Sequence, residues 1–322
     1  MLPQLNIAHM KAKLPIIQGG MAVRVSTAKL AAAVANEGGI GVIAGTGLSV
    51  QMLQDEIRKA RQLTAGYIGV NVLFAVTQFA QLVKAAMKEK VDFIVSGAGF
   101  SRDIFTWSKE MNVPVISMVS SARVARLAEK LGAAAVVVEG KEAGGHLGTD
   151  RSVFDILHEV VGSVKIPVLA AGGIMNGYDI AHALNIGAQG VQMATRFVTS
   201  VECEAHENFK NLYLSSGPED SVMIDSPVGL PGRALRNPMT EQLAKEKQLR
   251  IEKCDNCLKH CSRSFCILDV LNKAVDGDVE NGLVFSGEHF HAVKEIQSVK
   301  NIIASLVHEY EIAIAEMKSA IL

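Results

Sequence analysis

The sequence predicts a (β/α)8 barrel, or TIM barrel, followed by a mostly helical C-terminal extension. Strand-like and helix-like runs alternate eight times within the first 215 residues of the 322-residue chain. Most strand-like runs are apolar on both faces, as in parallel strands that are covered by helices. Glycines recur where these strands end rather than inside the helices. An open, doubly wound sheet is the alternative fold, because it is built from the same β/α units.

The predicted strands are short apolar runs that end in glycine or in a polar residue. This pattern is typical of strands buried inside an α/β fold, and short linkers join them to the helices. The strands are predicted at residues 15–18, 40–44, 67–74, 93–96, 115–119, 133–138, 168–171 and 190–194.

A helix-like run follows each predicted strand. Ser26 or Thr27 can cap the first helix, and Ser120 or Ser121 can cap the fifth, because their hydroxyl groups can accept from free N–H groups of the first turn. The helices are predicted at residues 27–36, 50–63, 77–88, 102–110, 121–131, 153–161, 178–185 and 204–214. Eight such units favour a closed barrel, whose catalytic rim lies at the carboxyl ends of the strands.

The character of the chain changes after residue 217. Residues 225–238 are rich in turn formers and predict an ordered excursion without secondary structure. Residues 241–253 predict a charged helix with a solvated face. Residues 288–322 predict one or two amphipathic helices that pack on the barrel or form a homodimer contact. We therefore divide the chain into a barrel domain, 1–215, and a C-terminal extension, 216–322.

The composition excludes several classes of protein. Hydrophobic residues make up 49% of the chain and charged residues 20%, which supports a large core and argues against disorder. The net charge of −1 gives no reason to expect nucleic acid or an anionic membrane as a partner. No apolar run is long enough to span a bilayer, and the first residues lack the apolar core of a secretory signal. We expect a cytoplasmic protein.

The sixth predicted strand leads into the strongest candidate for chemistry. Residues 133–148 begin as an apolar run and then break into EGKEAGGHLG. Glycines on both sides of His146 let the chain curl tightly and let a flat ligand approach the backbone. His146 can act as an acid or a base, because imidazole titrates near neutral pH. The alternative interpretation is a polar loop with a surface histidine.

A phosphate site is predicted at the ends of the last two strands, where barrels often bind phosphate through backbone N–H groups. Gly172 and Gly173 leave these groups uncovered, and Thr195 adds a hydroxyl group after Met193 and Ala194. The sequence contains no Walker lysine and no glycine motif of the dinucleotide-binding type. A phosphorylated cofactor held by a barrel fits this pattern better than a dinucleotide does.

Further residues on the same rim suit a flat ring system. Backbone N–H groups and a flexible thioether follow the first strand, an asparagine amide can both donate and accept, and a glutamate can accept from a sugar-like hydroxyl. Together with the phosphate site they predict an FMN-binding barrel. The residues concerned are Gly19, Gly20, Met21, Ala22, Asn71, Gly97, Glu139 and Gly145.

Six motifs resemble those of the nitronate monooxygenase family, formerly called 2-nitropropane dioxygenases, which includes the FMN-dependent enoyl-acyl-carrier-protein reductase II. They span residues 14–215 in the family's order. Ala194 departs from the glycine that relatives often carry, and residues 23–26 resemble the monooxygenases more than the reductases. The motifs are QGGMA (18–22), GVN (69–71), SGAG (96–99), EGKEAGGHLG (139–148), AAGGI (170–174) and QMATRF (192–197).

The resemblance implies a TIM barrel, non-covalent FMN and His146 as the catalytic histidine. It also implies a set of residues that contact FMN. These are Gly19, Met21, Ala22, Asn71, Glu139, Gly172, Gly173, Ala194 and Thr195.

Four of the five cysteines form a second candidate site outside the resembling region. Cys254, Cys257, Cys261 and Cys266 could provide four thiolates for a zinc ion or an iron–sulfur cluster. The spacing matches neither paired zinc knuckles nor ferredoxins, so free thiols are the alternative.

Three functions follow from these features. The first is an FMN-dependent oxidoreductase of nitronate monooxygenase type, which oxidises alkyl nitronates with O2 to carbonyl compounds and nitrite. The second is an NAD(P)H-dependent reductase of enoyl thioesters or another acceptor. The third is a flavin- or metal-binding module that senses redox state through the cysteines.

Overall fold

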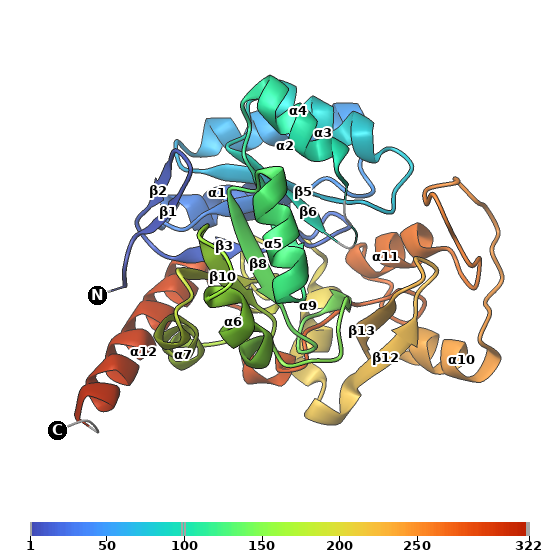
Figure 1. The fold of residues 1–322 in the computed structure, drawn as a ribbon. Helices are drawn as coiled ribbons and strands as arrows, with labels where there is room; N and C mark the ends of the chain where they lie inside the picture. The colour runs from blue at the N-terminus through green and yellow to red at the C-terminus, as the bar shows by residue number, and fades with distance from the viewer. Residues whose placement is uncertain (1, 98, 100, 320–322) are drawn as a thin grey trace.

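The barrel fold is confirmed by a computed structural model, which describes residues 2–97, 99 and 101–319. Within these residues, eight parallel strands form one sheet in the order β3-β11-β10-β8-β7-β6-β5-β4. Helices lie around this sheet (Figure 1). Their bounds are β3 Ile16–Gln18, β4 Gly41–Ala44, β5 Ile68–Leu73, β6 Phe93–Gly97, β7 Val115–Val119, β8 Ala135–Glu139, β10 Val168–Ala171 and β11 Gly190–Met193.

The sheet closes into a barrel between its two edge strands. Ile17 and Ile40 form a parallel bridge, Gln18 N–H donates to the Ile40 carbonyl at 2.9 Å, and Ile40 N–H donates to the Ile16 carbonyl at 2.9 Å. An open, doubly wound sheet has no such contact between its edges. The alternative fold is therefore ruled out.

A hairpin that the sequence analysis missed covers one end of the barrel. Strands β1 (Leu5–Ile7) and β2 (Met10–Ala12) pair antiparallel. Leu5, Ile7 and Met10 are fully buried in the same apolar cluster as the inward-facing strand residues. The hairpin lies at the amino ends of the strands, since Lys11 N–H donates to the Tyr67 hydroxyl just before β5. The opposite rim is left to carry the site.

Helices surround the barrel close to their predicted positions. The N-cap hydroxyls of Ser49 and Ser121 accept backbone N–H groups, and Asn176 forms a capping box with Asp179. The predicted helix 204–214 begins only at Glu207, after a separate short helix. The bounds are α1 Ala28–Asn36, α2 Val50–Leu63, α3 Phe79–Lys88, α4 Asp103–Met111, α5 Ala122–Leu131, α6 Val153–Val161, α7 Gly177–Ile186, α8 Thr195–Val198 and α9 Glu207–Ser215.

The extension differs from its prediction in three places. The excursion 225–238 is largely a hairpin of β12 (Ser221–Asp225) and β13 (Pro231–Leu235), which pairs with the short strand β9 (Gly145–His146). The predicted helix 241–253 is α10, Pro238–Glu246, and ends where Lys247 adopts φ 57°. Helix α11, Ile267–Val275, was not predicted. A long helix closes the chain, α12 Val299–Ser319.

Barrel and extension share one apolar core, in which α12 packs against α7. The hydrogen bond from Gly177 N–H to Glu309 Oε2 is 2.8 Å long.

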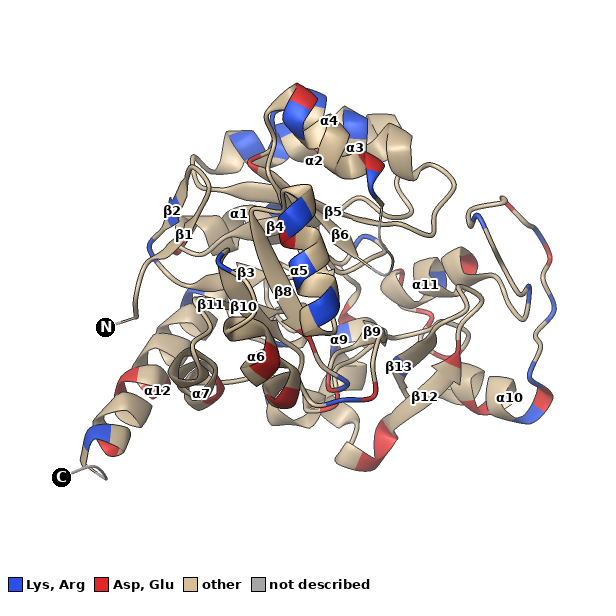
Figure 2. Cartoon of the chain, viewed as in Figure 1, with Lys and Arg blue, Asp and Glu red and all other residues tan. Residues whose placement is uncertain are grey.

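Figure 2 shows Lys, Arg, Asp and Glu on the outer helices and on the loop between α10 and α11. No helix in the described residues combines the length and apolar character needed to cross a bilayer. Predicted positions 98 and 320–322 lie outside the described residues.

The α7–α12 contact depends on the lack of a side chain at Gly177. A Cβ atom there would lie 2.2 Å from Tyr310 N and 2.5 Å from the Leu306 carbonyl oxygen. We expect Gly177→Ala to push α12 outward and to lower the free energy of unfolding by about 1–3 kcal/mol, measured by denaturant titration. Gly162→Ala is the control, because a Cβ there meets nothing within 4 Å. Equal stability of the two variants would show that the helices do not pack this closely.

Candidate active site

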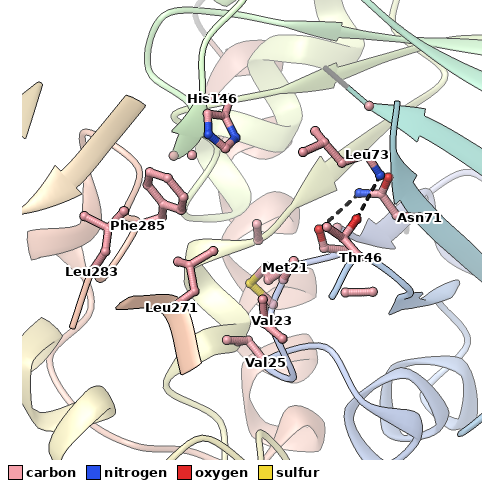
Figure 3. A pocket seen from close by; sticks show the side chains of 18 of the residues that line it. Met21, Val23, Val25, Thr46, Asn71, Leu73, His146, Leu271, Leu283 and Phe285 are labelled. Atoms are coloured by element: carbon pink, nitrogen blue, oxygen red, sulfur yellow. Dashed lines mark hydrogen bonds between the residues drawn. The ribbon is translucent and has the colours of Figure 1, made fainter. Parts of the chain in front are cut away.

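A cavity opens at the carboxyl ends of the barrel strands, between the strand ends and the extension (Figure 3). Eleven of the fourteen residues that the sequence analysis assigned to catalysis or cofactor binding line it. They are Gly19, Gly20, Met21, Ala22, Asn71, Gly97, Glu139, Gly145, His146, Ala194 and Thr195.

Gln18 and Ser26 hold the loop that follows β3. The buried Gln18 amide donates to Ser26 Oγ at 2.8 Å and to the Gly19 carbonyl, and its Oε1 accepts from Val42 N–H at 3.2 Å. Ser26 Oγ accepts from Met21 N–H at 2.9 Å and donates to the Gly19 carbonyl at 3.1 Å. Ser26 therefore shapes the cavity wall and does not cap α1. Thr27, the other predicted cap, occupies the N-cap position, but its hydroxyl accepts no N–H group of the helix.

Asn71, in β5, carries a polar atom that lacks a partner. Its Nδ2 donates to the Gly20 carbonyl at 3.1 Å, whereas its Oδ1 is buried and has no hydrogen bond to any described residue. A Cβ on Gly20 would lie 2.5 Å from Asn71 Cβ, so only glycine fits there. A buried acceptor without a partner is unfavourable by about 1–3 kcal/mol. A bound group with an N–H or O–H donor would satisfy it.

His146 is held by the extension rather than by the barrel. Its backbone pairs with Gly232 in β13, and Leu147 N–H donates to the Pro231 carbonyl at 2.9 Å. Its Nε2 lies 2.8 Å from the Ser226 hydroxyl. The Phe285 ring packs edge-on against the imidazole, with 5.1 Å between ring centroids. Burial lowers the pKa of His146 to about 4, so the ring is neutral at pH 7.

Glu139 is the only acidic or basic residue within the eight barrel strands. It ends β8 and lines the cavity. Burial raises the pKa of its carboxyl group to about 7. Near neutral pH this side chain can therefore both donate and accept hydrogen bonds.

The extension also covers the predicted phosphate region. Gly287 N–H donates to Thr195 Oγ1 at 3.1 Å, and His289 Nδ1 lies 3.2 Å from the Gly173 carbonyl. Gly172 and Gly173 have φ of 97° and 74°, which explains the glycine pair after β10. These two glycines and Met193, which is buried in β11, do not line the cavity. Their cofactor contacts stay predictions.

Several lining residues were not predicted as site residues. Within the described part of the chain, the Gln192 amide donates only to the Met118 sulfur, at 3.7 Å. It lies inside the QMATRF motif, so the motif itself was the missed signal. The lining contains no lysine or arginine from the described part of the chain. An apolar wall comes from positions remote in sequence, which gave no local signal: Val76, Val228, Leu258, Ile267, Leu268, Leu271, Leu283 and Phe285.

The predicted metal site at the cysteines is not supported. All four thiols are free, and the described residues contain no group of three or more His, Cys, Asp or Glu side chains that could hold a metal ion. Cys254 and Cys261 are exposed, while Cys257 lines the cavity. Burial and the neighbouring cysteines raise the pKa of the Cys257 thiol to about 11, so it stays protonated.

The shift at Glu139 predicts a pH-dependent effect on stability. Its pKa is about 7 in the folded, cofactor-free protein, against 4.5 for an ordinary exposed glutamate, so its favourable contribution is lost as the pH rises through 7. We expect Glu139→Gln to be more stable than the wild type at pH 8, by at most about 3 kcal/mol, and to lose this advantage at pH 4.

The measurement is chemical unfolding of the FMN-free protein at both pH values. Glu316→Gln, at an exposed position in α12, removes the same charge and is the control. An equal difference between Glu139→Gln and the wild type at pH 4 and pH 8 would contradict the assigned shift.

Comparison with known proteins places these features in one family. A sequence model described as nitronate monooxygenase matches residues 4–89 and 73–309. A probable nitronate monooxygenase of Staphylococcus aureus is 32% identical over 276 residues, which cover 72% of this chain and 78% of that protein. A Rhodococcus jostii protein, (3aS,4S,5R,7aS)-5-hydroxy-7a-methyl-1-oxo-octahydro-1H-indene-4-carboxyl-CoA dehydrogenase, is 31% identical over 73% of this chain and 66% of its own length.

The solved structure of FabK from Thermotoga maritima is similar over nearly the whole chain. The TM-score is 0.87 with 34% sequence identity, and the match covers 96% of each chain. The similarity therefore includes the extension that covers the cavity as well as the barrel.

Proposed function

The chain belongs to the nitronate monooxygenase family, and on that premise we propose that this oxidoreductase uses FMN to oxidise alkyl nitronates. O2 is the electron acceptor, and the products are a carbonyl compound and nitrite. One observation carries the proposal. The imidazole of His146 and the unpartnered Oδ1 of Asn71 share a cavity at the rim where barrels of this kind hold their chemistry.

The residues around the cavity fit FMN. The unpartnered Asn71 Oδ1 would accept a hydrogen bond from an N–H group of the ring system. Glu139 would meet the sugar-like chain, and the Thr195 hydroxyl, with the nearby backbone N–H groups, would hold the phosphate. The chemistry that FMN supplies when bound is electron transfer between the substrate and oxygen.

The side chains of this protein would bind and orient the nitronate. The neutral His146 ring can donate one hydrogen bond to a nitro oxygen or accept one proton. The apolar wall would take the alkyl group and exclude water from the site. Phe285 would keep the imidazole facing the cavity.

The first test is reduction of the bound flavin in the absence of oxygen. We expect the purified protein to be yellow and propyl-2-nitronate to bleach it. Loss of the imidazole in His146→Ala removes a hydrogen bond to the nitronate and should slow this reduction by about tenfold or more, with no change in FMN content. His158→Ala, on the exposed face of α6, should match the wild type. A flavin that no nitronate bleaches would rule out this substrate.

A second function is favoured by the apolar wall and by whole-chain similarity to FabK. In this alternative, FMN would supply hydride transfer from NAD(P)H to the β-carbon of an enoyl thioester, and a proton would be added at the α-carbon. The wall would hold the acyl chain, and His146 would place the thioester. The apolar wall offers more surface than a small nitronate could contact, so it suits a long acyl chain better.

The two functions are separated by mixing the anaerobic protein with NADH or NADPH. Rapid flavin bleaching, followed by recovery on addition of an enoyl-CoA, would support the reductase. In that case Leu271→Trp, which puts a larger side chain into the cavity at the apolar wall, should lower the turnover of long-chain enoyl-CoA more than that of short-chain enoyl-CoA. No bleaching by either nucleotide would leave the nitronate reaction as the function.

A further inference from the structure

We propose that Ser226 is a positioning residue, which fixes His146 as the tautomer that carries its proton on Nδ1. In this state the imidazole is a hydrogen-bond donor toward the cavity and is not a base there. The inference rests on the proposed function only for its substrate, since the tautomer itself is a property of the protein.

The hairpin brings Ser226 to His146 from 80 residues further along the chain. Ser226 follows β12 directly and is buried. Its backbone is held by the turn at the hairpin tip, where Ser226 N–H donates to the Leu230 carbonyl at 3.3 Å and Gly229 N–H donates to the Ser226 carbonyl at 2.9 Å. The same hairpin pairs with the backbone of His146. The 2.8 Å contact between Nε2 and Oγ is therefore fixed from both sides.

Counting protons gives the direction of this hydrogen bond. Val228 N–H already donates to Ser226 Oγ, at 3.4 Å. Among the described residues, His146 Nε2 is the only acceptor within reach of the Ser226 hydroxyl proton. A buried hydroxyl without an acceptor is unfavourable by about 1–3 kcal/mol. The hydroxyl therefore donates, Nε2 accepts, and the single proton of the neutral ring is on Nδ1.

The surroundings favour a donor at this position. The ring's only hydrogen bond within the described residues is the one to Ser226, so Nδ1–H is free to face a ligand. The cavity lining has no lysine or arginine among the described residues, so the binding of an anionic nitronate would depend on neutral hydrogen-bond donors. An Nδ1–H group can bind the oxygen of a nitronate but cannot take the α-proton of a neutral nitroalkane. The geometry therefore points to preformed nitronates as substrates.

Phe285 keeps the imidazole in this orientation. Its ring packs edge-on against His146, and its carbonyl accepts a hydrogen bond from the buried Tyr213 hydroxyl. Ser226 therefore needs to determine only which nitrogen of the His146 ring carries the proton.

The direct test is nitrogen-15 NMR of histidine-labelled, FMN-bound protein, with the His146 signals assigned by comparison with His146→Gln. We expect Nδ1 to carry the proton and Nε2 to be a hydrogen-bonded acceptor. Ser226→Thr should keep this pattern, whereas Ser226→Ala should lose it. A proton on Nε2 in the wild type would overturn the proposal.

Kinetics give an independent readout. We expect the wild type to oxidise propyl-2-nitronate much faster than 2-nitropropane. Ser226→Ala should lower kcat/KM for propyl-2-nitronate about tenfold, as for the loss of one hydrogen bond, and should lower the already small value for 2-nitropropane less. Ser226→Thr should keep the wild-type ratio of kcat/KM for the nitronate to that for the nitroalkane. Ser262→Ala, at an exposed serine, should not alter this ratio. Equal losses with both substrates would contradict the proposal. If no nitronate is oxidised, the proposed function fails, and the NMR result still decides the tautomer.

Discussion

The short backbone pairing between β9 and β13 is the contact on which the site depends. Gly145 and His146 leave the barrel at the end of the loop after β8, and Gly232 and Arg233 of the extension pair with them. This pairing brings Ser226 and the apolar wall to the barrel mouth. A barrel alone would present its glycine-rich rim to solvent. The extension covers much of that rim and forms a cavity, lined in large part by apolar side chains, in which hydrogen bonds and charges act in lower dielectric than in water.

Low polarity in the cavity sets the state of each ionisable group that lines it. Burial keeps His146 neutral and raises the pKa of Glu139 to about 7. The Cys257 thiol stays protonated for the same reason. Asn71 adds a buried acceptor without a partner. Such groups lower the stability of the cofactor-free protein, and they persist at functional sites because a bound ligand satisfies them.

The barrel and its rim could be predicted from the sequence because short, local sequence patterns indicate both. Apolar runs and the glycines after them mark the strands and their carboxyl ends, and His146 lies in the glycine-rich loop that follows one of these runs. The hairpin 221–235 was not predicted, because Pro and Gly disfavour strands. The pairing of β12 with β13 and of β13 with β9 stabilises it. Ser226 and Phe285 meet His146 only through this long-range pairing. Helix α11 was missed because the cysteine spacing before it suggested a metal site.

The most direct measurement is a crystal structure of the purified, yellow protein together with its FMN content. The account predicts one FMN per chain in the cavity, with a donor group of its ring on Asn71 Oδ1, the phosphate near Thr195 and the His146 imidazole against the ring. A colourless protein that takes up no FMN, or an FMN bound away from His146, would contradict it.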